Sequence, residues 1–391
     1  MKKDNLKLAG GTSHSMKTIR LLAAISVAAT VGLVTAAQAQ SSAPAGFLPN
    51  HLAVLRAGDG AVSLRLKQSP TFVDEFATDG FNNAPIMSVA IPTNGPDAMF
   101  FNGHAATEGM MSRSADGKLL TFAGYGGVNL LQQPGTPSLL DIGRALCAVD
   151  AAGKSQTILF EQYNGTNKMN PRGAVSDGAN HFWTCGNVTG TAYYDAGTKT
   201  FTPFITIPDS RQVKIIGGSL YTALNAADAM YVGTSPGIFS FADAEGNAVA
   251  LPTAAETTLK LEVPAAKPYG KIAGFDMNVE GSIAYTADVD MGIQKYVKAG
   301  GAWKLAYNFK IPQNIPDADN HENGCFGLTV DFSGANPVIY ATTTEGWNGS
   351  ANSNRVVQIV DTGATAKVTT LAQSPSTEIV YRGIALTPES K

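Results

Sequence analysis

The chain has 391 residues, of which 44% are hydrophobic and 15% are charged, and its formal net charge is −3. This balance excludes a general nucleic-acid binder, because such proteins need a surplus of Lys and Arg to displace counterions from phosphates. With 41 glycines, 20 prolines and few charges, the chain fits many short strands and turns better than helices.

The first 39 residues have the features of a secretory signal peptide. Basic residues precede an apolar run from Leu21 to Ala36, and Ala37-Gln38-Ala39 is a small-residue cleavage pattern. Cleavage before Gln40 removes five basic residues and Asp4, which leaves 23 Lys and Arg against 30 Asp and Glu, a charge near −7. We therefore expect a secreted or periplasmic protein without a membrane span, with a flexible leader over residues 40–50 and a single domain over residues 51–391.

A hairpin outline recurs along the mature chain. After strand-like runs at His51–Asp59, Pro70–Phe76 and Ile86–Ile91, the segment Glu108–Tyr125 predicts two strands joined at Ala115-Asp116-Gly117-Lys118. Asp-Gly favours such a turn because Gly adopts positive φ without steric cost. The full and truncated copies of this outline begin at Glu108, Arg172, Arg211, Tyr269, Asn323 and Arg382.

Further strands follow several of these hairpins. They are predicted at Ala145–Val149 with Thr157–Glu161, Thr191–Tyr194 with Thr200–Ile205, Gly292–Val297 with Lys304–Phe309, and Arg355–Val360 with Val368–Leu371. One copy every 39 to 64 residues fits one four-stranded blade plus loops. We therefore predict an all-β fold, a β-propeller of six blades, with a seventh, degenerate blade in Ala226–Pro264 as the alternative.

The last copy, RGIALTPES from Arg382, has no strands after it, whereas the N-terminal trio of strands lacks an innermost strand. We expect the two ends of the chain to pair within one blade, which closes the ring and removes exposed sheet edges. A two-domain sandwich, the rival architecture, does not explain why the last strand resembles the first strand of each repeat.

In a propeller, residues at equivalent positions just before the inner strands converge on one mouth of the central channel, and here these positions are rich in Arg, His, Glu and Tyr. The candidate catalytic residues are His104, His321 and Tyr269, and the candidate substrate-binding residues are Glu108, Tyr125, Arg172, Arg211, Asn323 and Arg382. Three arginines favour an anionic ligand, because guanidinium pairs bidentately with carboxylate, phosphate or sulfate. β-Elimination on a uronic acid is then a coherent mechanism, in which Arg neutralises the sugar carboxylate while His or Tyr moves the proton.

Other interpretations stay open. The charged residues could be ion pairs that tie blades together, and Glu108 with Glu322 could be a glycosidase pair. A non-catalytic propeller that binds a glycan or an envelope protein, and a metal-dependent hydrolase of lactonase or phytase type, are the alternative functions. No cofactor is expected, although Asp317–Glu322 and the pair Asp288 and Asp290 offer oxygens for a structural calcium ion. Cys147, Cys185 and Cys325 allow at most one intrachain disulfide, or are three buried thiols.

The segments SRSADGKLLTFAGY, GIQKY at Gly292–Tyr296 and the closing YRGIALTPE resemble a group of exported bacterial propeller proteins, most of them of uncharacterised function. The resemblance covers essentially the whole mature chain and implies the propeller fold. More loosely, the mouth is similar to that of propeller polysaccharide lyases of the rhamnose–glucuronate lyase type. This second resemblance implies an acidic oligo- or polysaccharide as the substrate and matches His104 to the catalytic histidine.

Overall fold

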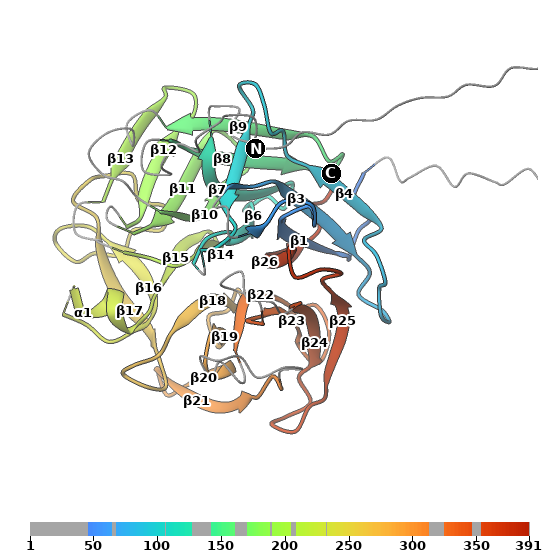
Figure 1. Cartoon of the computed structure of the whole chain (residues 1–391). Helices are drawn as coiled ribbons and strands as arrows, with labels where there is room; N and C mark the ends of the chain where they lie inside the picture. Colours follow the sequence, from blue (N-terminus) through green and yellow to red (C-terminus); the bar gives the residue numbers. More distant parts are fainter. Residues whose placement is uncertain are drawn as a thin grey trace, which may run out of the picture. The chain divides into compact units, whose positions relative to one another are not determined.

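A computed structural model describes residues 46–64, 68–105, 107–126, 142–160, 170–187, 190–204, 209–231, 233–312, 324–345 and 353–390. The predicted signal peptide and the first part of the leader lie outside these residues. Six small antiparallel sheets form a ring, which confirms the predicted all-β, six-bladed β-propeller (Figure 1). Within the described residues, no helix has the length and apolar character needed to cross a membrane.

The strands are grouped as follows, from the innermost strand of each blade outward except in blade 2. Blade 1 contains β26 (Val380–Leu386), β1 (Leu52–Ala57), β3 (Thr71–Phe76) and β4 (Met87–Ala90). Blade 2 contains β2 (Gln68–Ser69), β5 (Met99–Asn102), β6 (Met111–Arg113), β7 (Leu119–Gly126), β8 (Gly143–Asp150) and β9 (Ser155–Phe160). In this blade β5 and β6 both pair with β7, and β2 pairs with β5. Blade 3 contains β10 (Pro171–Ser176), β11 (His181–Gly186), β12 (Ala192–Asp195) and β13 (Thr200–Pro203).

The other three blades follow in chain order. Blade 4 contains β14 (Val213–Ile216), β15 (Ser219–Leu224), β16 (Gly237–Ala242) and β17 (Thr258–Pro264). Blade 5 contains β18 (Ile272–Met277), β19 (Ile283–Asp288), β20 (Gly292–Ala299) and β21 (Ala302–Phe309). Blade 6 contains β22 (Cys325–Asp331), β23 (Val338–Thr343), β24 (Arg355–Val360) and β25 (Val368–Gln373).

Blade 1 closes the ring as predicted. Strand β26 pairs antiparallel with β1, with Leu52 opposite Leu386 and Ala57 opposite Val380. Strand β1 in turn pairs along its whole length with β3. Both β1 and β26 are almost continuously apolar because their blade packs against a neighbouring blade on each face, and this removes the alternation typical of a sheet with one wet face.

The region Ala226–Pro264 completes blade 4, so the alternative of a seventh blade there is wrong. Strands β16 and β17 are the two outer strands that β14 and β15 would otherwise lack. The segment is long because a short helix, α1 (Ala226–Tyr231), is inserted between β15 and β16. The Asn225 side chain caps this helix by accepting the backbone N–H of Asp228 at 3.0 Å.

The predicted hairpin in blade 2 is confirmed. Strands β6 and β7 pair around Gly117, whose φ of 76° is the conformation that the turn requires. Glycine also permits close approach of inner strands: a Cβ added at Gly383 would lie 2.3 Å from the backbone nitrogen of Met111. At this point β26 and β6 meet near the axis, so only a residue without a side chain fits.

The spaces between blades are filled by apolar side chains that are almost fully buried. Between blades 1 and 2, for example, Leu55 and Val73 belong to the same cluster as Met111 and Phe122. All three cysteines are free and buried, and burial raises the pKa of Cys147 and of Cys185 to about 12. They are therefore unreactive small apolar side chains rather than a disulfide pair.

Candidate functional site

The inner strands run in one direction along the axis, as the parallel bridge between Met110 and Gly173 indicates for blades 2 and 3. We call the end of the ring where the inner strands begin the front end, and the end where they finish the rear end. A cavity of about 230 Å3, the front pocket, lies at the front end. Its floor consists of Met110, Ala273, Val289 and Phe326, which form one buried apolar cluster. Its rim carries polar groups, namely Thr107, Arg211, Asn225 and Lys271.

A break in the innermost strand of blade 2 positions Glu108. Strand β7 pairs with β6 at its beginning and with β5 at its end, and the chain between β5 and β6 leaves the sheet. Glu108 lies in this break, where Oε1 accepts the Tyr125 hydroxyl at 2.6 Å and Oε2 accepts the Asn102 N–H at 3.1 Å. Burial raises the pKa of Glu108 to about 7, although both hydrogen bonds oppose the shift. The site thus contains a carboxyl that exchanges a proton near neutral pH.

Arg382 lies on the blade 1 side of Glu108. Its guanidinium is 5.8 Å from the ring centre of Phe326, and Nη2 donates to the Gly103 carbonyl at 3.1 Å. Burial lowers the pKa of Arg382 to about 10, so the group stays charged at neutral pH. Among the described residues, its buried Nη1 has no hydrogen-bond partner.

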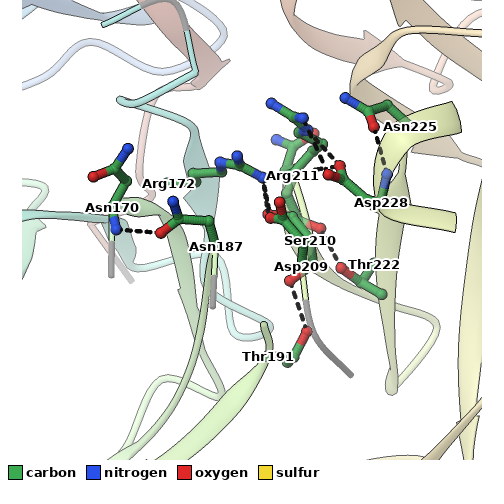
Figure 2. A network of polar contacts seen from close by, with 11 residues as sticks. Asn170, Arg172, Asn187, Thr191, Asp209, Ser210, Arg211, Thr222, Asn225 and Asp228 are labelled. Atoms are coloured by element: carbon green, nitrogen blue, oxygen red, sulfur yellow. Dashed lines mark hydrogen bonds and ion pairs between the residues drawn. The ribbon is translucent and has the colours of Figure 1, made fainter. Parts of the chain in front are cut away.

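Two arginines and two aspartates from blades 3 and 4 form the second part of the site, which we call the Arg–Asp cluster: Arg172, Asp209, Arg211 and Asp228 (Figure 2). Arg172 Nη1 donates to Asp209 Oδ1 and lies 3.9 Å from Asp228 Oδ2. Arg211 donates to Asp228 through Nε at 2.7 Å and Nη2 at 3.3 Å. Both arginines therefore already face carboxylates of the chain, as the open alternative of structural ion pairs expects.

The two aspartates of the cluster titrate differently. Burial, together with a hydrogen bond to Asp228, raises the pKa of Asp209 to about 7. Burial acts in the same direction on Asp228 and is the largest single influence, but Arg211, Arg172 and the contact with Asp209 together outweigh it and lower the pKa of that carboxyl. Because the two carboxyls interact directly, they titrate as a pair that keeps one proton well above the usual range of an aspartate.

The structure brings together five of the residues that the sequence predicted. Tyr125 bonds to Glu108, the charges of Arg382 and Arg172 both act on Glu108, and Arg211 acts on Arg172 within the Arg–Asp cluster. His104 is exposed, directly after the Gly103 that accepts Arg382, and Tyr269 is 65% exposed. Neither lines the front pocket. His321 and Asn323 lie outside the described residues.

Sequence reasoning missed the apolar floor and Asp228. Met110 and Phe326 have the character of ordinary core residues, and only the structure shows that they face a cavity. Asp228 lies on α1, which is inserted in blade 4 and has no counterpart in the repeats. An Asp three residues after Asn225 at the start of a short helix was the available signal.

The rear end also contains a cavity, of about 430 Å3, in which both basic residues of the lining pair with a carboxylate. Arg113 pairs with Glu389, and Lys214 Nζ bonds to Asp276 Oδ2 at 2.8 Å. A wider space of about 740 Å3 lies among surface turns and the chain ends, with Phe47, Lys118 and Ala152 in its lining.

Within the described residues, no three His, Cys, Asp or Glu side chains gather as a metal site. Asp288 instead accepts three backbone N–H groups, from Lys271, Asp290 and Met291, at 2.7 to 3.0 Å. Asp290 pairs with Lys271 Nζ at 2.8 Å. The segment Asp317–Glu322 lies outside the described residues, so a calcium ion there stays a prediction.

No protein-family model matches the chain, and no curated protein matches it. Solved structures do match, at low identity. A protein assigned as a 6-phosphogluconolactonase from Bacteroides uniformis is 12% identical over 84% of this chain and 83% of its own, with a TM-score of 0.42. The hydrazine synthase of Kuenenia stuttgartiensis is 14% identical over 68% and 66%, with a TM-score of 0.36. The dihydro-heme d1 dehydrogenase NirN is 14% identical over 82% and 53%, with a TM-score of 0.37. These likenesses assign no activity to this chain, whose six sheets make it a six-bladed β-propeller.

Proposed function

We propose that the protein is an exported propeller that binds one unit of an acidic, uronate-containing glycan in the front pocket. The observation that carries the proposal is the lining of this pocket, which combines an apolar floor with a rim of hydrogen-bonding and cationic groups. A sugar ring has the matching character, because its C–H face is apolar and its edge carries hydroxyls. Drug-sized ligands occupy cavities of about 300–1,000 Å3, so a pocket of 230 Å3 fits one ring of a longer chain.

The charges at the rim support an acidic unit over a neutral one. Arg211 lines the pocket at the edge of the Arg–Asp cluster, and Lys271 stands beside it with half of its side chain exposed. Both can approach a carboxylate from the solvent side while they keep their present partners. Asn225 and Thr107 supply neutral donors and acceptors for hydroxyl groups.

The test compares uronate oligosaccharides with neutral oligosaccharides of the same length by calorimetry on the mature protein. The variant Asn225→Asp keeps the helix cap but adds a negative charge at the rim, so we expect at least tenfold weaker binding of the uronate. Lys271→Met should also weaken it, whereas Lys118→Met, which removes an equally exposed lysine among the rear turns, should not. Equal binding of acidic and neutral sugars, or indifference to both rim variants, would disprove the proposal.

β-Elimination on a uronate unit outside the front pocket is the second candidate, and the observation in its favour is the position of His104. This exposed imidazole follows Gly103, which Arg382 holds, close in sequence to Glu108 and its bond to Tyr125. Incubation with uronate polysaccharides should then produce an unsaturated sugar that absorbs in the ultraviolet. The product should be lost in His104→Ala, His321→Ala or Tyr269→Phe. Binding without any unsaturated product would leave a non-catalytic glycan-binding propeller.

Two parts of the proposal have their own measurements. Export with cleavage predicts that the secreted protein begins at Gln40, which N-terminal sequencing reads directly. The metal-dependent lactonase or phytase hypothesis predicts a stoichiometric divalent ion in the purified protein, and elemental analysis decides it.

A further inference from the structure

The two aspartates of the Arg–Asp cluster lie around the same guanidinium. Arg172 Nη1 donates to Asp209 Oδ1 and lies 3.9 Å from Asp228 Oδ2, so one nitrogen atom has both carboxyls close to it. Two ionised carboxylates held so near to each other repel. A proton on the pair relieves this repulsion, as in other carboxyl pairs that share a site.

The guanidinium groups complete the charge balance. When the pair carries its proton, Arg172 and Arg211 supply two positive charges against one negative charge. When the proton leaves, the cluster is neutral. One donor of the cluster also lacks a partner: Arg172 is 5% exposed, and its buried Nε–H has no acceptor among the described residues.

We propose that the proton shared by Asp209 and Asp228 sets the charge of the front end, and that an anionic ligand beside Arg211 binds together with that proton. The ligand class, a carboxylate-bearing sugar, rests on the proposed function. The proton shared by the two aspartates does not depend on that function. An anion at Arg211 restores neutrality only while the pair is protonated. Its binding therefore favours the protonated pair and becomes weaker as the proton is lost.

Several neighbouring groups face this pair and have to be separated from it. Arg172 on β10 and Arg211 ahead of β14 act on both carboxyls, and the thiol of Cys185 on β11 stays neutral in this pH range. Glu108 is the other carboxyl that acts on Arg172 and titrates near neutral pH. It is the one rival source of the same pH dependence among the described residues that act on these arginines.

The first experiment measures the affinity for a glucuronate oligosaccharide between pH 5.5 and 8.5 at constant ionic strength. For the unmodified protein we expect a nearly constant dissociation constant below pH 6.5 and a weakening that approaches tenfold per pH unit above about pH 7. Asp209→Asn, which imitates the protonated carboxyl, should bind tightly at every pH. Glu108→Gln should show the same weakening of the affinity with rising pH as the unmodified protein. A slope that survives in Asp209→Asn and disappears in Glu108→Gln, or a protein that binds without any slope, would overturn the inference.

A second experiment needs no sugar. In protein labelled with 13C at the aspartate carboxyls, one resonance should titrate near pH 7 and be missing in Asp209→Asn. Inorganic sulfate, which supplies charge without a sugar ring, should move that midpoint upward. If no aspartate titrates above pH 6, or if sulfate leaves the midpoint unchanged, the inference fails whether or not a sugar binds. If the glucuronate fails to bind while both NMR results hold, the proposed function alone is wrong.

Discussion

The two ends of the ring use charged residues in opposite ways. At the rear end, Lys214 of blade 4 bonds to Asp276 of blade 5 and to the Leu328 carbonyl of blade 6, at 2.8 and 3.1 Å. The Asp276 carboxylate also accepts donors from Met277, Thr329 and Val330. The Lys214 links cross three blades, so this end holds the ring together.

The front end is not balanced in this way. Two aspartates lie between two arginines, and the buried Glu108 stands near Arg172 and Arg382, each of which retains a buried N–H without an acceptor among the described residues. Charged groups that serve only stability are expected to be fully paired, because an unmatched buried charge is costly. The comparison teaches that the same residue types are matched by opposite charges at one end and incompletely matched at the other.

The largest effect is expected from breaking the balanced end. Lys214→Met leaves Asp276 without its cation in a largely buried position, and we expect a loss of about 4 kcal/mol in the free energy of unfolding. Urea denaturation measures it. The matched control is Lys118→Met, whose exposed partner Asp116 lies 3.8 Å away, and it should cost less than about 1 kcal/mol. A rear-end loss as small as that of the control would remove the distinction between the two ends.

The second largest effect is expected in how the stability depends on pH, and it comes from Glu108 at the front end. Because the pKa of Glu108 is raised in the folded state, its ionisation disfavours folding. Its contribution to stability is fully present below about pH 4 and is lost as pH rises to about 7, by on the order of 3 kcal/mol. The free energy of unfolding, measured by denaturation between pH 4.5 and 8, should therefore change less with pH for Glu108→Gln than for the unmodified protein. The same dependence of the unfolding free energy on pH in both proteins would contradict this assignment.

The smallest effect is expected at the front aspartate. Asp209→Asn replaces a carboxyl that already holds a proton much of the time at neutral pH, so the free energy of unfolding should change by less than about 1 kcal/mol. Asp276→Asn, the same chemical change at the rear end, should cost several times more because it removes the counter-charge of Lys214. Equal losses in the two variants would mean that both ends are structural.

The sequence predicted the ring because the repeats carry local signals. The turn at Gly117 and the isolated last strand from Arg382 are visible without a structure, and both are confirmed. The repeats also placed Glu108, Arg172, Arg211 and Arg382 at one end, since equivalent positions of a ring face the same way.

The partners of these side chains could not be predicted. Asp228 approaches the arginines only because α1 folds back after Asn225, and this insertion breaks the repeat. Spacing also cannot tell whether a guanidinium is neutralised by the chain or by a ligand, because that depends on distances of a few ångströms between blades. The front pocket, which Phe326 lines, could not be predicted either. A strand residue that faces a cavity has the same sequence pattern as one that faces a neighbouring side chain.

The closure of blade 1 has a consequence for biosynthesis. The segment Val380–Leu386 is made more than 300 residues after Leu52–Ala57, yet it completes the same sheet. Until this segment has been made and released, the inner edge of Leu52–Ala57 has no partner and the ring stays open at one seam. A stop codon placed just before Val380 should therefore yield an aggregation-prone, protease-sensitive product rather than a folded propeller that is slightly shorter.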